Sequence, residues 1–131
     1  MRSFRAGAML TVSDVCVPIS RLAECVEETK RDIIRNGLTA PIAGHVGDGN
    51  FHAGLAVKMD DPTEVTNAKA FLDRLTERAL SMEGTCTGEH GIGQGKKHFM
   101  EPEHGAPAVA LMRTLKRAVD PDNIMNPGKI V

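Results

Sequence analysis

The chain has 131 residues, a formal net charge of −1 and neither Trp nor Tyr. This length predicts one domain over residues 1–131 with a sizeable core. The near-neutral charge and the lack of basic runs argue against nucleic acid as a partner. The three cysteines show no CxxC spacing, which indicates reduced thiols and a cytoplasmic location.

The first half of the chain alternates between strand and helix patterns. Residues 9–17 (MLTVSDVCV) are rich in strand formers and predict one strand. Apolar residues at helical spacing predict a helix over residues 20–35, which Asn36-Gly37 ends. Two more strands are expected at about 40–46 and 51–58.

A second helix begins at a clear signal. Asp61 is a good N-cap, and Pro62 fits the first helical position. The helix should run to Gly84, and a short strand at 85–87 could follow. The order β-α-β-β-α predicts an α+β fold of the ferredoxin-like type, an antiparallel sheet with helices on one face. A short helix at 107–119 would begin a C-terminal helical tail.

Two glycine-rich segments, GHVGDGNFH at 44–52 and GTCTGEHGIGQG at 84–95, carry three of the five histidines. Asp48-Gly49 between apolar runs predicts a two-residue hairpin turn. In that register His45 lies directly opposite His52 on a face of small residues, while the other face is apolar and packs on a core.

Two histidines on an uncrowded sheet face suit a metal ion. Catalytic zinc sites use three protein ligands and keep one position open, so a third ligand is expected, and Glu89 is the natural candidate. His90 lies beside Glu89 in the sequence and is available for other chemistry. The residues alone also allow a second interpretation, in which the histidines are ordinary polar surface. Asn50 either contacts a substrate or caps the turn.

Four segments carry a family resemblance: DVCVPISRL, GHVGDGNFH, GTCTGEHGIGQGK and DPDNIMNPGKI, in this order. Over about residues 9–131 the chain resembles the C-terminal part of FAD-linked oxidases. Within that family it is most similar to the group of cytochrome-type D-lactate dehydrogenases and glycolate oxidase subunits.

The resemblance implies a flavoprotein in which another domain binds FAD and this one covers the flavin and holds a small 2-hydroxy acid. The HxGDGNxH motif implies metal ligands at His45 and His52, and the GEHG motif a third at Glu89. It further implies that His90 takes the hydroxyl proton, that Asn126 lies near the flavin, and that the metal is divalent, often zinc.

The expected FAD-binding domain is not recognisable in these residues, so an FAD-binding domain or subunit is an expected partner. The chain alone is expected to be inactive and to form a homodimer. Any association with a membrane is expected to occur through electron-transfer partners. The resemblance further implies that relatives acting on 2-hydroxyglutarate carry a lysine on the first strand, at the position of Val12. We therefore expect D-lactate or glycolate as the substrate.

Two other functions stay open. The chain could be a stand-alone metal-binding or interaction module without redox activity. Alternatively, it could be a metal-dependent hydrolase that uses His45, His52 and Glu89 with a bound water.

Overall fold

The computed structural model describes residues 5–131. Contacts group the chain into two compact units, Met1–Glu89 and His90–Val131, and each is described by itself below. The single domain over residues 1–131 stays a prediction. Within the described part of the chain, no helix combines the length and the apolar character needed to cross a membrane.

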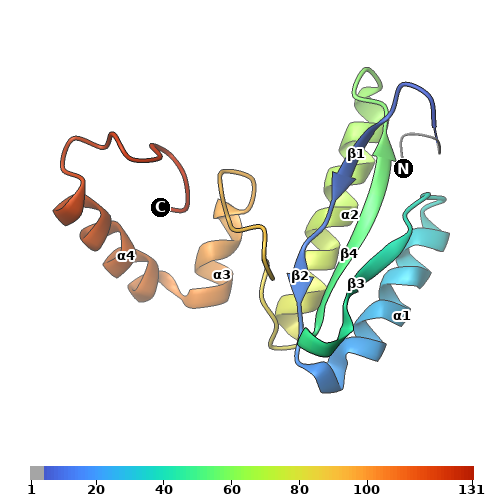
Figure 1. Ribbon diagram of the computed structural model, residues 1–131, viewed down its shortest axis with the longest axis horizontal. Helices are drawn as coiled ribbons and strands as arrows, with labels where there is room; N and C mark the ends of the chain where they lie inside the picture. The colour runs from blue at the N-terminus through green and yellow to red at the C-terminus, as the bar shows by residue number, and fades with distance from the viewer. Residues whose placement is uncertain (1–4) are drawn as a thin grey trace. The chain divides into compact units, whose positions relative to one another are not determined.

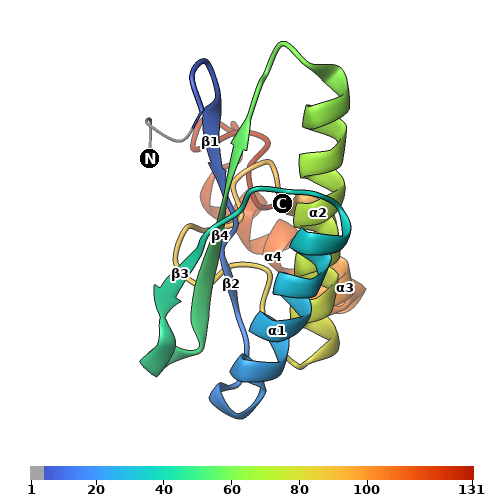
Figure 2. The same ribbon diagram turned by 90° about the vertical axis from the view of Figure 1, so that its right-hand side faces the viewer.

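The first unit is a four-stranded antiparallel sheet with two long helices on one face (Figures 1 and 2). Its elements in chain order are β1 (Met9–Val12), β2 (Val15–Cys16), α1 (Ile19–Arg35), β3 (Ile42–His45), the 3₁₀ turn η1 (Val46–Asp48), β4 (Asn50–Val57) and α2 (Pro62–Ser81).

The strand β4 lies at the centre of this sheet. It pairs with β1 and β2 along one edge and with β3 along the other. Thr85 forms a single antiparallel bridge to Cys16, at the place where a ferredoxin-like sheet has its fourth strand. The predicted α+β arrangement, with helices on one face, is confirmed.

The core lies between β4 and the two helices. Alternate residues of β4 point into it and are buried, namely Phe51, Ala53, Leu55 and Val57. They pack with fully buried residues of α2, including Phe71 and Leu75. Because side chains alternate along a strand, Asn50, His52 and Gly54 point to the other face. The sequence of β4 therefore fixes which face can hold a site.

The strand predicted over residues 9–17 is interrupted at Ser13 and Asp14. Here the Ser13 hydroxyl accepts the Ala53 N–H at 2.7 Å, and the Ser13 N–H donates to the Ala53 carbonyl at 3.0 Å. A side-chain hydroxyl thus replaces one backbone acceptor of the ladder. The interruption turns the Asp14 carboxylate into the interior, where it is 1% exposed.

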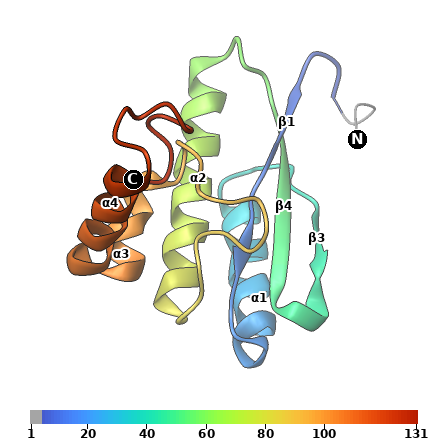
Figure 3. The same cartoon turned by 60° about the vertical axis from the view of Figure 1, so that its left-hand side comes forward.

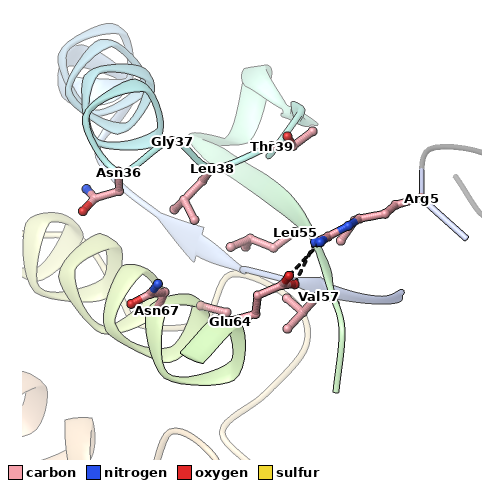
Figure 4. Close-up of a pocket in the computed structure, with 11 residues that line it drawn as sticks. Arg5, Asn36, Gly37, Leu38, Thr39, Leu55, Val57, Glu64 and Asn67 are labelled. Atoms are coloured by element: carbon pink, nitrogen blue, oxygen red, sulfur yellow. Dashed lines mark hydrogen bonds and ion pairs between the residues drawn. The ribbon is translucent and has the colours of Figure 1, made fainter. Parts of the chain in front are cut away.

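Helix α2 begins as predicted. The Asp61 carboxylate accepts the N–H groups of Thr63 and Glu64, and Pro62 is the first helical residue. The Glu64 carboxylate accepts the Lys58 N–H and pairs with Arg5 at 2.7 Å. This ion pair borders a cavity of about 400 Å³ (Figure 4).

A buried carboxylate joins the two helices. Asp32 of α1 accepts two hydrogen bonds from Arg74 and one from Arg78, both on α2, at 2.8–3.1 Å. Burial raises the pKa of Asp32, but the hydrogen bonds from Arg74 and Arg78 outweigh it and hold that pKa below its usual value. Asp32 and the two arginines therefore form a cross-link between α1 and α2.

The second unit contains η2 (Lys97–Phe99), α3 (Met100–His104) and α4 (Ala106–Val119), followed by a tail without strands in its described residues (Figure 3). The Asp120 carboxylate accepts the N–H groups of Ile124 and Met125, which turns the chain after α4. Ile130 then donates to the Gly93 carbonyl at 2.9 Å. The predicted helical tail is confirmed.

Candidate metal centre

The hairpin that carries the two histidines differs from the predicted one. Its loop spans residues 46–49, with η1 followed by Gly49 in the left-handed region at φ 75°. In this register His45 pairs with Asn50, and Ala43 pairs with His52. The predicted two-residue turn, with His45 directly opposite His52, is therefore wrong.

Contacts from outside the hairpin explain the wider loop. The Val17 N–H donates to the Gly49 carbonyl at 3.0 Å, and the Cys16 thiol donates to the Asp48 carbonyl at 3.2 Å. These bonds hold the loop against the segment that enters α1. The true register differs from the predicted one by two residues, and a shift of two leaves every side chain on the same face.

His45 and His52 consequently remain on one face, as diagonal neighbours. Their ring centroids are 6.1 Å apart, with the rings nearly perpendicular. His45 is exposed and His52 is mostly buried. The prediction that both histidines lie on the face away from the helices is therefore still correct, although they do not pair directly.

One ring nitrogen of His52 has a defined protonation. Its Nδ1 lies 2.9 Å from the Ser13 carbonyl oxygen. A carbonyl can only accept, so Nδ1 carries a hydrogen and donates it. In the neutral ring Nε2 then keeps its lone pair, which is the arrangement found in metal-ligating histidines whose other nitrogen is held by a carbonyl.

Glu89 reaches both histidines from the segment after α2. Its Oε1 lies 3.0 Å from His52 Nε2, and its Oε2 lies 3.7 Å from His45 Nε2. Ligand atoms around a tetrahedral zinc with bonds of 2.0–2.1 Å are about 3.3–3.4 Å apart. The observed separations bracket this value, and one atom from each residue lies within 4.8 Å of the other two.

The charge of this group also fits a cation. As metal ligands, two neutral imidazoles and one carboxylate would carry a net charge of −1, which suits a cation. His52 Nε2 and Glu89 Oε1 lie 3.0 Å apart, so a proton or a metal ion between them would satisfy both atoms. The three residues fit a divalent cation in donor type, separation and charge.

Sequence reasoning missed Asp14, which lies beneath these ligands. Its carboxylate accepts the Asn50 amide at 2.9 Å, the Thr87 hydroxyl at 2.7 Å and the Glu89 N–H at 3.0 and 3.2 Å. The signal was a single aspartate inside an otherwise apolar, strand-forming run. Such a position is unfavourable unless the carboxylate is buried with hydrogen-bond donors.

Asn50 is buried beside His52. Its amide nitrogen donates to Asp14 and to the Val15 carbonyl, and within the described residues its Oδ1 has no hydrogen-bond partner. The side chain does not cap the turn, which was one of the two predicted roles. Contact with a substrate stays a prediction.

The two remaining predicted residues belong to the second unit. His90 is its first residue and directly follows Glu89. Asn126 lies in the exposed tail in the left-handed region at φ 47°, and its carbonyl accepts the Lys129 N–H. Their predicted roles, general base and flavin contact, stay predictions.

Cys16 lies near the loop but does not suit a metal ligand. Burial raises the pKa of its thiol, and the negative charges of Asp14 and Asp48 raise it further. Its thiol donates to the Asp48 carbonyl, which requires the protonated form. Metals bind the thiolate, so the nitrogen and oxygen ligands define the site.

Comparison with known proteins identifies the family of this chain. The chain belongs to the family described as FAD linked oxidases, C-terminal domain, whose model matches residues 2–130. The chain is 51% identical over 129 residues to a probable mitochondrial D-lactate dehydrogenase of Danio rerio, covering 98% of this chain and 26% of the relative.

Two further relatives have related names. The mitochondrial D-lactate dehydrogenase [cytochrome] 1 of Saccharomyces cerevisiae is 46% identical over 95% of this chain and 21% of its own length. The glycolate oxidase subunit GlcD of Bacillus subtilis is 32% identical over 91% of this chain and 25% of its own length. The chain thus spans about a quarter of these relatives.

Proposed function

We propose that this chain forms the substrate- and metal-binding part of a flavin-dependent dehydrogenase that oxidises a small D-2-hydroxy acid to the 2-oxo acid. The observation that carries the proposal is the convergence of His45, His52 and Glu89, with the His52 tautomer fixed by the Ser13 carbonyl. Membership of the FAD-linked oxidase family and the names of the relatives support the reaction class.

His45, His52 and Glu89 would hold a divalent ion, with zinc as our first choice for two nitrogen ligands and one oxygen ligand. When bound, such an ion orients a hydroxyl and a carboxylate oxygen and makes the hydroxyl more acidic. His90 would take the hydroxyl proton, because it follows the ligand Glu89 directly and an imidazole suits base chemistry near neutral pH. The hydride would pass to FAD.

The face around the site supports a small monocarboxylate. Val12 pairs with Gly54 and lies on the same face as His52, because Gly54 and His52 are two residues apart on β4. A second carboxylate at Val12 would meet an apolar side chain instead of a cation, which is costly when water is excluded. D-lactate or glycolate therefore fits better than a dicarboxylate.

The flavin would be bound mainly by an FAD-binding domain or subunit, with Asn126 near its ring. The second unit offers a surface for such a partner, because several apolar side chains are exposed on it: Leu111, Leu115, Val119, Ile124, Met125 and Ile130. A homodimer, a cytoplasmic location and an electron-transfer partner at a membrane stay predictions.

The decisive experiment uses this chain together with its FAD-binding domain or subunit. We expect D-lactate to bleach the bound flavin in anaerobic stopped-flow measurements. We expect His52→Ala and His90→Gln to slow bleaching at least about 100-fold, which is the lower bound for loss of a general base. Dithionite must still reduce the flavin in both variants. Bleaching at the wild-type rate in both variants would refute the proposal.

A further inference from the structure

The buried Asp14 carboxylate connects the two parts of the chain that supply the metal ligands. We propose that Asp14 is a positioning residue that places Glu89 against His52 before any metal binds. This inference rests on the proposed metal-binding function and adds to it a residue outside the set His45, His52 and Glu89.

The hydrogen bonds of Asp14 define what it holds. Asp14 lies in the interruption between β1 and β2, and its side chain is 1% exposed. Its Oδ2 accepts the Thr87 hydroxyl at 2.7 Å, and its Oδ1 accepts the Asn50 amide at 2.9 Å. The Glu89 N–H lies within 3.2 Å of both carboxylate oxygens. One carboxylate thus fixes β4 and the backbone of the ligand residue together.

The Glu89 segment has little regular structure of its own. Among the described residues, its backbone pairing with the sheet is the single bridge between Thr85 and Cys16. Hydrogen bonds to an ionised acceptor are roughly twice as strong as neutral ones. The bonds from Thr87 and Glu89 to Asp14 therefore carry much of the attachment of this segment, and they end at the ligand itself.

Asp14 also lies behind the second ligand. Its Oδ1 is 3.9 Å from His52 Nδ1, while that nitrogen donates to the Ser13 carbonyl. A buried negative charge at this distance favours a cation on the far side of the ring, because attraction is stronger in a low-dielectric interior. Asp14 thus contributes by position and by charge.

The backbone at Gly88 packs closely against Asn50 and Asp14. A Cβ built on Gly88 would overlap the Asn50 amide nitrogen and lie 3.0 Å from Asp14 Oδ1. The backbone of residue 88 therefore lies directly against the pair that Asp14 forms with Asn50. Glycine at this position lets Thr87 and Glu89, on either side of it, both reach the same carboxylate.

The test measures zinc binding by the whole 131-residue chain, by competition with a chromophoric chelator. The variants are Asp14→Asn and Thr87→Val, with Asp48→Asn as the matched control on the exposed loop. Changes in groups that orient metal ligands typically cost 10–100-fold in affinity, so we expect a Kd about 10–100-fold higher for Asp14→Asn. We expect a smaller increase for Thr87→Val and no change for Asp48→Asn.

A second readout separates positioning from general stability. In the metal-free protein, at a temperature where every variant is folded, Asp14→Asn and Thr87→Val should speed hydrogen exchange of the Glu89 amide. The Cys16 and Thr85 amides, each of which donates to the carbonyl of the other residue, should exchange at the wild-type rate. Because Asp14→Asn removes a buried charge and can fail to fold, Thr87→Val alone is sufficient for the test.

The outcomes separate the two proposals. A wild-type Kd in both variants, with binding lost in His52→Ala, would overturn the role of Asp14 and leave the metal centre standing. Failure of the wild-type chain to bind zinc would overturn the proposed metal centre and this inference with it. Weaker zinc binding together with faster Glu89 exchange would support both.

Discussion

His52 and Glu89 come from distant parts of the chain and meet with His52 Nε2 3.0 Å from Glu89 Oε1. Because His52 Nδ1 donates its hydrogen to the Ser13 carbonyl, Nε2 is the nitrogen that would bind the proposed metal ion together with Glu89. We expect the chain to bind about one equivalent of Zn²⁺, and His52→Ala to weaken binding more than the 10–100-fold typical of outer-shell changes. Equilibrium dialysis with metal analysis measures both quantities.

The matched control for that experiment is His104→Ala. His104 lies at the end of α3, and the prediction gives it no part in the site. Its loss should leave the zinc stoichiometry and Kd unchanged. Equal zinc content in wild type and in the His45→Ala/His52→Ala double variant would show that zinc binds elsewhere.

The cross-link between α1 and α2 predicts how stability depends on pH. The folded-state pKa of Asp32 is lowered, so its contribution is present above the unfolded-state value of about 3.9 and is lost as pH falls through the folded-state value. Asp32→Asn should lower the free energy of unfolding by about 3 kcal/mol at pH 7, because it removes the buried carboxylate shared by Arg74 and Arg78 and leaves the mostly buried Arg78 with the half-exposed Glu28 as its remaining charge partner. This loss of unfolding free energy should be smaller at acidic pH.

Urea unfolding of wild type and Asp32→Asn at pH 7 and pH 3 measures this difference. The control is Glu27→Gln, whose partner Lys30 is exposed, as is Glu27 itself. Exposed pairs contribute about 0–1 kcal/mol, so this variant should stay close to wild type. A difference between Asp32→Asn and wild type that does not change with pH would contradict the assignment.

A single added methyl group tests the packing beneath the site. Gly88→Ala places a Cβ on the Asn50 amide, so we expect a loss of about 1–3 kcal/mol in stability, the usual cost of overpacking, and weaker zinc binding. Gly47→Ala is the control, since a Cβ there meets nothing within 4 Å. Thermal unfolding and zinc titration of both variants measure the contrast. Equal behaviour would mean that Asn50 moves aside freely.

Substrate choice can be tested at Val12. In the FAD-containing enzyme, Val12→Lys should raise kcat/KM for 2-hydroxyglutarate relative to D-lactate by at least about 10-fold, because a hydrogen bond to a charged group contributes about 1.5–3 kcal/mol. Leu10→Lys adds the same charge two residues earlier on the same face and serves as the positional control. A wild-type preference for 2-hydroxyglutarate would refute the proposed substrate size.

Purified alone, the chain should be colourless, free of FAD and inactive with D-lactate and an artificial acceptor. We also expect a dimer, because the exposed apolar side chains of the second unit would be covered by another copy. Absorbance and light scattering check both points. Leu115→Glu should shift the dimer toward monomer, whereas a yellow, active preparation would contradict the assignment of flavin binding to another domain.

Local signals in the sequence predicted helix boundaries better than loop geometry. Asp61 and Pro62 start α2 as expected, because an N-cap acts through its nearest neighbours. Asp48-Gly49 did not form the expected turn, because Val17 and Cys16 bind the loop from elsewhere in the fold. The face of His45 and His52 was still predicted correctly, since the register error was an even number of residues.

The role of Asp14 could not be predicted from its neighbours in sequence. Residues 9–17 have a strand pattern, and nothing local shows that Ser13 replaces a backbone acceptor or that Thr87 and Glu89 bind the carboxylate. Contacts between such distant positions depend on the finished sheet. The candidate ligands His45, His52 and Glu89 could be named from the sequence because each lies in a short local motif, and their role as ligands stays a prediction.

The bridge between Thr85 and Cys16 has a consequence for biosynthesis. A nascent chain that ends before residue 89 carries His45 and His52 but lacks Glu89, so it offers two of the proposed ligands and only weak affinity for metal. The third ligand arrives once the sheet has closed around Asp14. Metal uptake would then follow folding, and metal would stabilise only the completed unit, by about 2.7 kcal/mol at a free concentration of 100 times Kd.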